Sequence, residues 1–169
     1  VLCTDIEKIE PAQRIQTGRE ITGSIRYGQL DALDMPYKEE FDIILFKSVL
    51  GGIGRNNHPE KQREALQQIY HALKPGGELF FAENLAASPI HRYFRKKFVR
   101  WGGEWRYVTI PEMLEYLSPF SDVQYTTAGF TAAFGRMELV RKLLGYVDMA
   151  TDRIVPPSWR YIMIGIARK

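Results

Sequence analysis

Two aspartates stand where the carboxyl ends of short apolar strands are expected. Asp5 follows the apolar residues 1–4, and Asp31 follows the alternating residues 25–30. In open α/β sheets, ligands bind beyond the carboxyl ends of the strands. One carboxylate there can accept hydrogen bonds from two vicinal ribose hydroxyls, and the other can accept one from an adenine amino group, while the backbone N–H of Ala32 meets a ring nitrogen. Taken singly, each aspartate also fits an ordinary loop or turn residue.

Three histidines are candidate general bases. His91 follows a predicted strand and stands beside a basic stretch, so we take it as the catalytic candidate. His71 lies inside a predicted helix that packs on the sheet, which favours a structural role. His58 stands at a predicted helix start, where capping or solvation accounts for it.

Residues 91–101 form a basic stretch interleaved with aromatic residues. The spacing of Phe94, Phe98 and Trp101 predicts one apolar face of a helix, with most basic residues elsewhere. One interpretation is a solvated helix over the mouth of an active site; another is a lid that receives an anionic substrate or lies on an acidic membrane surface. Basic and aromatic residues can also bind single-stranded nucleic acid, but the net charge of +3 is low for that and no nucleic-acid motif accompanies it.

The central part of the chain supplies the elements that would position these groups. Residues 43–46 form a continuous apolar run, which indicates a strand buried on both faces. Pro59 fits the first turn of a helix with apolar residues at 66, 69, 70 and 73. Gly76 and Gly77 allow the left-handed turn that ends a helix, and residues 79–82 read as another buried strand.

The last third predicts a helix, a strand, a second helix and a final strand. Thr109 and Glu112 have the spacing of a capping box at a helix start. Residues 123–127 alternate as a strand, residues 136–144 form an amphipathic helix that Gly145 would close, and residues 161–167 make the last strand. Strands that alternate with helices predict an α/β fold with a parallel sheet.

The joint pattern is more specific than its parts. Five short motifs are spaced as in the class I S-adenosylmethionine-dependent methyltransferases, and residues 1–85 therefore resemble that family. The motifs are Asp5, Asp31-Ala32, Met35-Pro36-Tyr37, Phe41-Asp42 and Leu73-Lys74-Pro75-Gly76-Gly77. The resemblance implies a three-layer Rossmann-like sheet, mostly parallel with an antiparallel last strand. It also implies one domain over residues 1–169 with a basic lid insertion at 86–108.

The family's first strand and its glycine-rich turn would precede Val1, so we expect the domain to be N-terminally incomplete. In the family, that strand lies between the counterparts of the strands at Val1 and Ile43, and these two are therefore not expected to be neighbours. Gly51-Gly52-Ile53-Gly54 follows the wrong strand to replace the missing glycine turn.

The resemblance also implies site residues, with S-adenosylmethionine as the cofactor. The single cysteine, Cys3, gives no metal cluster, so we expect no metal. The cofactor would be held by side chains and backbone at three strand ends: Asp5 and Ile6, then Asp31, Ala32 and Leu33, then Phe46 and Lys47. The substrate would meet Ser48, Trp105, Arg106 and Tyr107, although the last three could equally pack beneath the lid.

Composition is that of an ordinary globular domain, with 45% hydrophobic and 25% charged residues. The single cysteine, Cys3, and the absence of a signal-peptide pattern or a membrane-length apolar run fit a cytoplasmic protein.

We expect methyl transfer to a small-molecule or glycan-like acceptor, one that can be anionic, with no nucleic-acid partner. A non-catalytic module that binds an anionic partner through its basic lid is the alternative, and a nicotinamide-binding Rossmann enzyme is weaker because its glycine fingerprint is missing. The oligomeric state stays open.

Overall fold

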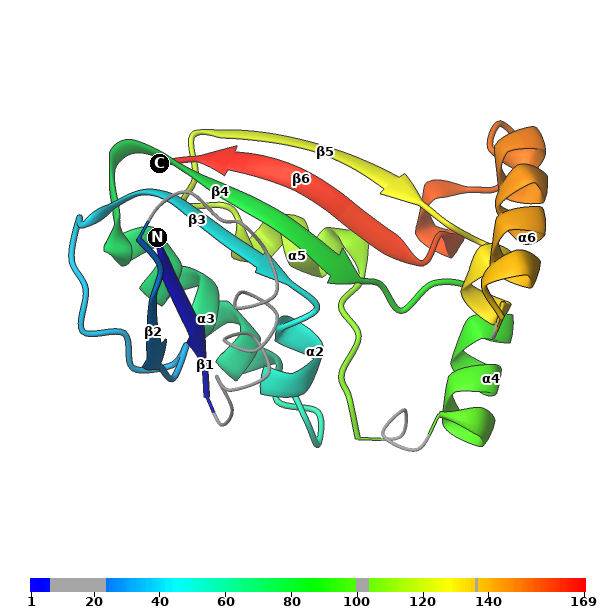
Figure 1. Ribbon diagram of the computed structural model, residues 1–169, viewed down its shortest axis with the longest axis horizontal. Helices are drawn as coiled ribbons and strands as arrows, with labels where there is room; N and C mark the ends of the chain where they lie inside the picture. The colour runs from blue at the N-terminus through cyan, green and yellow to red at the C-terminus, as the bar shows by residue number, and fades with distance from the viewer. Residues whose placement is uncertain (7–23, 100–103, 136) are drawn as a thin grey trace.

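The computed structural model describes residues 1–6, 24–99, 104–135 and 137–169 (Figure 1). The strands are β1 (Leu2–Asp5), β2 (Arg26–Gln29), β3 (Phe41–Lys47), β4 (Leu73–Asn84), β5 (Asp122–Ala128) and β6 (Ile162–Arg168). The helices are α2 (Leu50–Ile53), α3 (Pro59–Ala72), α4 (Pro89–Phe98), α5 (Ile110–Tyr116) and α6 (Glu138–Thr151), with 3-10 turns η1 (Ala132–Phe134) and η2 (Pro157–Trp159). Among the described helices, none combines the length and the apolar character needed to traverse a lipid bilayer.

The main sheet has four strands in the order β3-β4-β6-β5. Strands β3 and β4 pair in parallel, whereas β6 lies between β4 and β5 and runs antiparallel to both. The predicted α/β fold with an antiparallel last strand is therefore confirmed. Because β6 closes the sheet from the far end of the sequence, β4 becomes an inner strand with a partner on each side.

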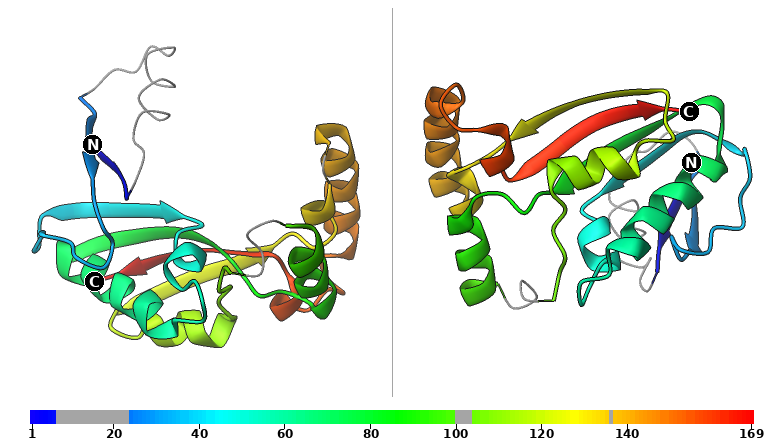
Figure 2. Two further views of the ribbon diagram at one scale, coloured as in Figure 1. Left: turned by 90° about the horizontal axis from the view of Figure 1, so that it is seen from below. Right: turned by 180° about the vertical axis from the view of Figure 1, so that it is seen from behind.

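One face of the main sheet carries the hydrophobic core. Leu79 and Phe81 of β4 alternate onto this face, where they meet Leu66 of α3 and Met113 of α5, all four buried. Helices α3 and α5 lie together beneath this face of the sheet (Figure 2, left). The period-two burial of β4 thus places its inward side chains under the helices and its other side chains on the opposite face.

The opposite face of the main sheet is bare within the described residues. Leu45 of β3 is 73% exposed, and Ile164 and Ile166 of β6 are also exposed. Of the three layers predicted from the sequence, the described residues therefore supply the sheet and one helical layer.

Strands β1 and β2 pair in parallel as a separate two-stranded sheet that projects from the main sheet (Figure 2, left). No hydrogen bond joins β1 to β3 in the described residues, as predicted. The loop after β2 connects the two sheets, because Ala32, Leu33 and Met35 pack against the main core.

The predicted signals at helix ends hold at the start of α5 and fail at the ends of α3 and α6. Helix α3 ends at Ala72, β4 begins at once, and Gly76 has a φ of 76°, so the glycine pair shapes a turn within the β4 segment. Thr109 and Glu112 form the complete predicted capping box of α5. The prediction that Gly145 ends the last helix is wrong, since α6 continues to Thr151. A glycine inside a helix costs only about 1 kcal/mol, which tertiary contacts readily outweigh.

Candidate functional site

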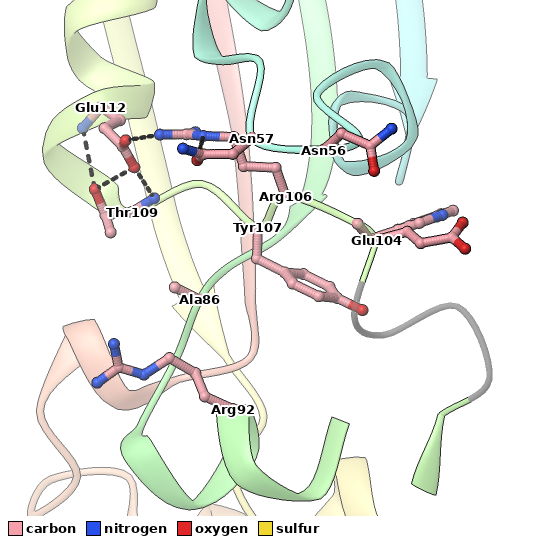
Figure 3. A pocket seen from close by; sticks show the side chains of 10 residues that line it. Asn56, Asn57, Ala86, Arg92, Glu104, Arg106, Tyr107, Thr109 and Glu112 are labelled. Atoms are coloured by element: carbon pink, nitrogen blue, oxygen red, sulfur yellow. Dashed lines mark hydrogen bonds and ion pairs between the residues drawn. The ribbon is translucent and has the colours of Figure 1, made fainter. Parts of the chain in front are cut away.

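A cavity of about 570 Å³ opens beyond the carboxyl end of β4 (Figure 3). Its lining comes from the turn after α2, the residues after β4, the start of α4 and the segment before α5. These residues are Asn56, Asn57, Ala86, Arg92, Glu104, Trp105, Arg106, Tyr107, Thr109 and Glu112. Of the predicted substrate residues, Trp105, Arg106 and Tyr107 are brought together here, whereas Ser48 does not line this cavity.

The wall of the cavity is positioned by backbone pairing with the sheet. Leu85, just past β4, forms a parallel bridge with Val108, and the Ala86 N–H donates to the Val108 carbonyl over 2.8 Å. On the other side, the Arg106 N–H donates to the carbonyl of Gly51 over 3.1 Å. The segment is thereby tied to both β4 and α2, so its side chains have defined directions.

Arg106 is held by other side chains of the protein. Its guanidinium donates to Gln62 Oε1 over 2.6 Å, to Asn57 Oδ1 over 3.3 Å and to the Glu112 carboxylate (Figure 3). Burial alone would raise the pKa of Glu112, but hydrogen bonds from the Thr109 N–H and from Arg106 outweigh it, and the pKa lies below its usual value. Arg106 therefore supports the wall of the cavity in this conformation.

Trp105 lies against Gly51 and Gly52, the two middle residues of α2. A Cβ added to Gly51 would stand 2.8 Å from the Trp105 ring, so only glycine allows this approach. The sequence excluded Gly51 and Gly52 from a cofactor role but did not show this contact. The indole N–H of Trp105 is buried, and within the described residues it has no hydrogen-bond partner.

Tyr107 is one of the side chains that line the cavity (Figure 3), and its ring contacts a buried cation, Arg95. The Arg95 guanidinium lies 3.9 Å from the Tyr107 ring centroid and 4.5 Å from that of Tyr161. Burial raises the pKa of the Tyr107 phenol, although Arg95 opposes the shift. Since the usual value is already 10.0, Tyr107 stays protonated at neutral pH and can donate a hydrogen bond.

The carboxyl ends of β3 and β4 are joined by Glu83. This fully buried carboxylate accepts hydrogen bonds from the N–H groups of Val49 and Leu50, each over 2.9 Å. Burial raises its pKa, while the backbone donors act in the opposite direction. Ser48, between β3 and these donors, has a φ of 54° and accepts a hydrogen bond from the Asn84 amide over 3.0 Å. A left-handed serine at a strand end is a strained conformation of the kind often found at functional sites.

His91, the candidate base, is only 2% exposed. Its Nδ1 lies 2.7 Å from the Ser88 hydroxyl and its Nε2 lies 2.9 Å from the Phe130 carbonyl. A carbonyl only accepts, so Nε2 carries the proton and Nδ1 accepts from Ser88. Burial lowers the pKa of the ring. The histidine is thus neutral, and both nitrogens are engaged within the protein; its role as a base stays a prediction.

The two aspartates expected to hold adenosine lie at the same edge of the β1–β2 sheet. Asp5 ends β1 opposite Gln29, the last residue of β2, and Asp31 follows two residues later. Asp31 Oδ1 accepts from the Leu33 N–H over 2.9 Å, which orders the turn. Two carboxylates at adjacent strand ends, with partly buried Ala32 and Leu33 beside them, fit the polar and apolar parts of an adenosine.

The remaining predicted cofactor residues are spread over different environments. Ile6 is 53% exposed after β1. Phe46 is buried and stacks on Phe81 with a centroid distance of 6.3 Å, whereas Lys47 is exposed. Phe46 and Lys47 border a second hollow of about 590 Å³ on the bare face of the main sheet. Their roles stay predictions.

Several cavity residues were not predicted from the sequence as site residues. Asn56 and Asn57 both have left-handed backbones, with φ of 58° and 64°, and they turn the chain between α2 and α3. Paired asparagines before Pro59 are a turn signal, and that pattern alone could have marked this wall. Glu104 and Glu112 offered no such signal, because a charged residue in a loop or first helical turn is usually solvated.

Comparison with known proteins gives a consistent family. Residues 5–122, well over half of the chain, match the family described as methyltransferase domain. Over 78 residues the chain is 32% identical to arsenite methyltransferase of Rattus norvegicus, covering 45% of this chain and 20% of that protein. The chain thus spans about a fifth of this curated relative.

Two solved structures show the same fold at low identity. A SAM-dependent methyltransferase of Thermotoga maritima aligns with a TM-score of 0.64 and 16% identity, over 98% of this chain and 72% of the other. Phosphoethanolamine N-methyltransferase 2 of Haemonchus contortus, solved with S-adenosyl-L-methionine, aligns with a TM-score of 0.63 and 14% identity, over 100% of this chain and 43% of the other. With the sheet order, the strand-end carboxylates and the family match in agreement, the chain belongs to the methyltransferase-domain family and has the class I fold that its sequence predicted.

Proposed function

We propose that this chain takes part in methyl transfer from S-adenosylmethionine to a small-molecule or glycan-like acceptor that carries negative charge. The observation that carries the proposal is the cavity beyond β4, in a chain whose strand ends also hold Asp5 and Asp31. When bound, S-adenosylmethionine supplies an electrophilic methyl group on a sulfonium centre. The protein's task is then chiefly to bind and orient the two reactants, because positioning alone can lower such a barrier by several kcal/mol.

Arg92 and Tyr107 support an anionic acceptor. Arg92 is exposed on the cavity wall, and in the described residues no ion pair joins it to an acidic side chain. A guanidinium can bind a carboxylate or phosphate through two parallel hydrogen bonds. Tyr107 can donate a further hydrogen bond from its protonated phenol. Arg106, in contrast, is already paired with Glu112.

A general base is required only if the acceptor atom must lose its proton early. His91 stays the proposed base, and it would have to exchange its Ser88 or Phe130 partner before a ring nitrogen could meet an acceptor. Replacing His91 with glutamine tests this role. Loss of a general base abolishes the acidic limb of the pH–rate profile, where protonation inactivates the base, whereas a packing defect lowers stability without changing the shape of that profile.

The cofactor proposal is tested by calorimetric titration with S-adenosylhomocysteine. Asp5→Ala and Asp31→Ala should each weaken binding about tenfold or more, because each removes charge-assisted hydrogen bonds. Asp34→Ala is the matched control, since Asp34 is an exposed carboxylate in the same loop. Equal losses in all three variants, or no binding to the parent chain, would contradict the proposal. No binding together with retained affinity for a polyanion would instead support the alternative of a non-catalytic module.

We also propose a cytoplasmic location and no nucleic-acid partner. The single cysteine, Cys3, and the modest net charge of +3 support these two proposals. Cell fractionation and a filter-binding assay with single-stranded RNA test them directly.

A further inference from the structure

Helices α4 and α6 each turn polar side chains toward the rest of the protein and expose a broad apolar face. On α4, His91 and Arg95 are buried, whereas Ile90, Phe94 and Phe98 are between 41% and 52% exposed. A helix on the surface of a globular protein ordinarily shows the reverse arrangement. The outer face of α4 is therefore matched to an apolar neighbour, and not to water.

Helix α6 repeats this arrangement. Asp148 faces inward and accepts hydrogen bonds from the N–H groups of Phe130, Thr131 and Ala132 at the entry to η1. No residue of α6 is buried, and its outward arc is apolar. The exposed side chains of this arc are Leu139 at 67%, Val140 at 40%, Leu143 at 59%, Tyr146 at 70%, Val147 at 45% and Met149 at 75%.

The two helices form one end of the molecule (Figure 1). Phe134 of η1 connects them. Its ring centroid lies 5.3 Å from that of Phe94 on α4, and the Ala132 N–H of η1 donates a hydrogen bond to Asp148 of α6. We call the outer faces of α4 and α6 together the end surface. An apolar area spread over two helices is too extensive to be explained as scattered surface residues and marks an interaction site.

Charge identifies the partner. In the described residues of 89–98 and 137–160, six basic side chains are exposed and only two acidic ones. The basic residues are Arg92, Lys96, Lys97, Arg141, Lys142 and Arg153, and the acidic ones are Glu138 and Asp152. Each acid is paired with an arginine, Glu138 with Arg141 and Asp152 with Arg160. Lys96, Lys97 and Lys142 are therefore available to external anions.

We propose that the end surface docks on a lipid bilayer that contains anionic phospholipid. Helices of this kind lie in the plane of the interface, with apolar and aromatic residues in the acyl boundary and lysines at the headgroups. Tyr93 and Tyr146 have the amphipathic rings that favour this depth, and both are more than half exposed. A second copy of the chain is the competing occupant, but two surfaces with the same excess of positive charge would repel each other.

The test is co-sedimentation of the full chain with vesicles, without cofactor or substrate. One set contains phosphatidylcholine alone, and the other contains about a third phosphatidylglycerol, which gives a negative surface potential. Binding is expected to the anionic vesicles, to weaken with added salt, and to be small for phosphatidylcholine.

Two pairs of variants separate specific docking from general stickiness. We expect each of two double variants to weaken binding to anionic vesicles about tenfold or more. The first combines Leu139→Asn with Leu143→Asn, and the second combines Lys96→Glu with Lys97→Glu. The controls are Leu45→Asn, an equally exposed leucine on the bare sheet face, and Lys38→Glu with Lys61→Glu, which changes net charge by the same amount. Circular dichroism checks that each variant is folded.

Loss of vesicle binding in the two end-surface variants, with binding retained in the controls, supports the proposal. It is overturned if the parent chain ignores anionic vesicles, if controls and end-surface variants lose binding alike, or if light scattering shows a dimer that Leu139→Asn with Leu143→Asn dissociates. Because no cofactor is present, the result is independent of whether S-adenosylhomocysteine binds.

Discussion

Replacing Arg95 with methionine should remove one of the main attachments of α4 to the sheet. The Arg95 side chain is 6% exposed and donates from Nη1 to the Leu85 carbonyl over 2.6 Å and to the Ala86 carbonyl over 3.3 Å. The guanidinium also lies between the rings of Tyr107 and Tyr161. Helix α4 is thus fixed to the chain just past β4 by a single cation.

The expected loss follows from opposing contributions. A hydrogen bond from a charged donor contributes about 1.5–3 kcal/mol, and a desolvated cation–π contact contributes up to about 2 kcal/mol. Burying the charge costs several kcal/mol, and the buried Nε and Nη2 of Arg95 have no hydrogen-bond partner among the described residues. Methionine keeps apolar volume but leaves the two carbonyls unpaired, so we expect the free energy of unfolding to fall by about 2–4 kcal/mol.

Urea unfolding followed by circular dichroism measures this loss. Arg95→Lys keeps the charge but not the flat donor group, and should lose about half as much. Lys96→Met is the matched control, since Lys96 is exposed on the same helix and should change stability by less than about 0.5 kcal/mol. If the free energy of unfolding of Arg95→Met lay within about 0.5 kcal/mol of that of the parent chain, the proposed attachment would be refuted. The cost of burying the charge would then equal the gain from its hydrogen bonds and ring contacts.

Three further predictions concern the cavity wall and the end of the molecule. Gly51→Ala gains up to about 1 kcal/mol of helix propensity but forces the Trp105 ring away from α2. We therefore expect the free energy of unfolding to fall by about 1–2 kcal/mol and the tryptophan emission spectrum to shift. An unchanged spectrum would contradict the contact. Glu112→Ala removes the capping box and the Arg106 pair and should lower the free energy of unfolding by about 2–3 kcal/mol, which thermal denaturation measures against the exposed Glu115→Ala. Burial raises the pKa of the Asp148 carboxyl, but hydrogen bonds from Thr131 and neighbouring N–H groups lower it further, so the pKa lies below its usual value. Its contribution to stability is therefore present above the usual aspartate pKa and is lost as the pH falls through the lowered one, a dependence that Asp148→Asn should abolish in urea titrations at several pH values.

Local signals in the sequence predicted the elements whose causes are local. The capping box of Thr109 and Glu112, the position of Pro59 at the start of α3 and the left-handed backbone at Gly76 all depend on residues within a few positions of one another. Strand alternation likewise predicted β5 near its observed bounds, because the alternation of side chains between two faces is a property of the strand itself.

The polar interior beneath α4 could not be predicted in this way. Spacing identified Phe94 and Phe98 as one apolar face, but not that this face points outward. That orientation depends on contacts of His91 with Phe130 and of Arg95 with Tyr161, both far away in the sequence. Trp101, which the sequence placed on the same face, lies outside the described residues. The same limit applies to Gly145, since the contacts of Asp148 that extend α6 beyond it come from the segment at 130–132.

The position of β6 has a consequence for how the chain acquires its fold. Strand β6 pairs with β4 along seven register positions, from Glu78 opposite Arg168 to Asn84 opposite Ile162, and the first two residues are 90 apart in sequence. Until residues 162–168 have been synthesised, β4 and β5 have no common partner, and the backbone N–H and C=O groups along the β4 edge that pairs with β6 stay unpaired. We therefore expect nascent chains that stop before Ile162 to associate with holdase chaperones, and refolding to be limited by this long-range pairing, not by helix formation.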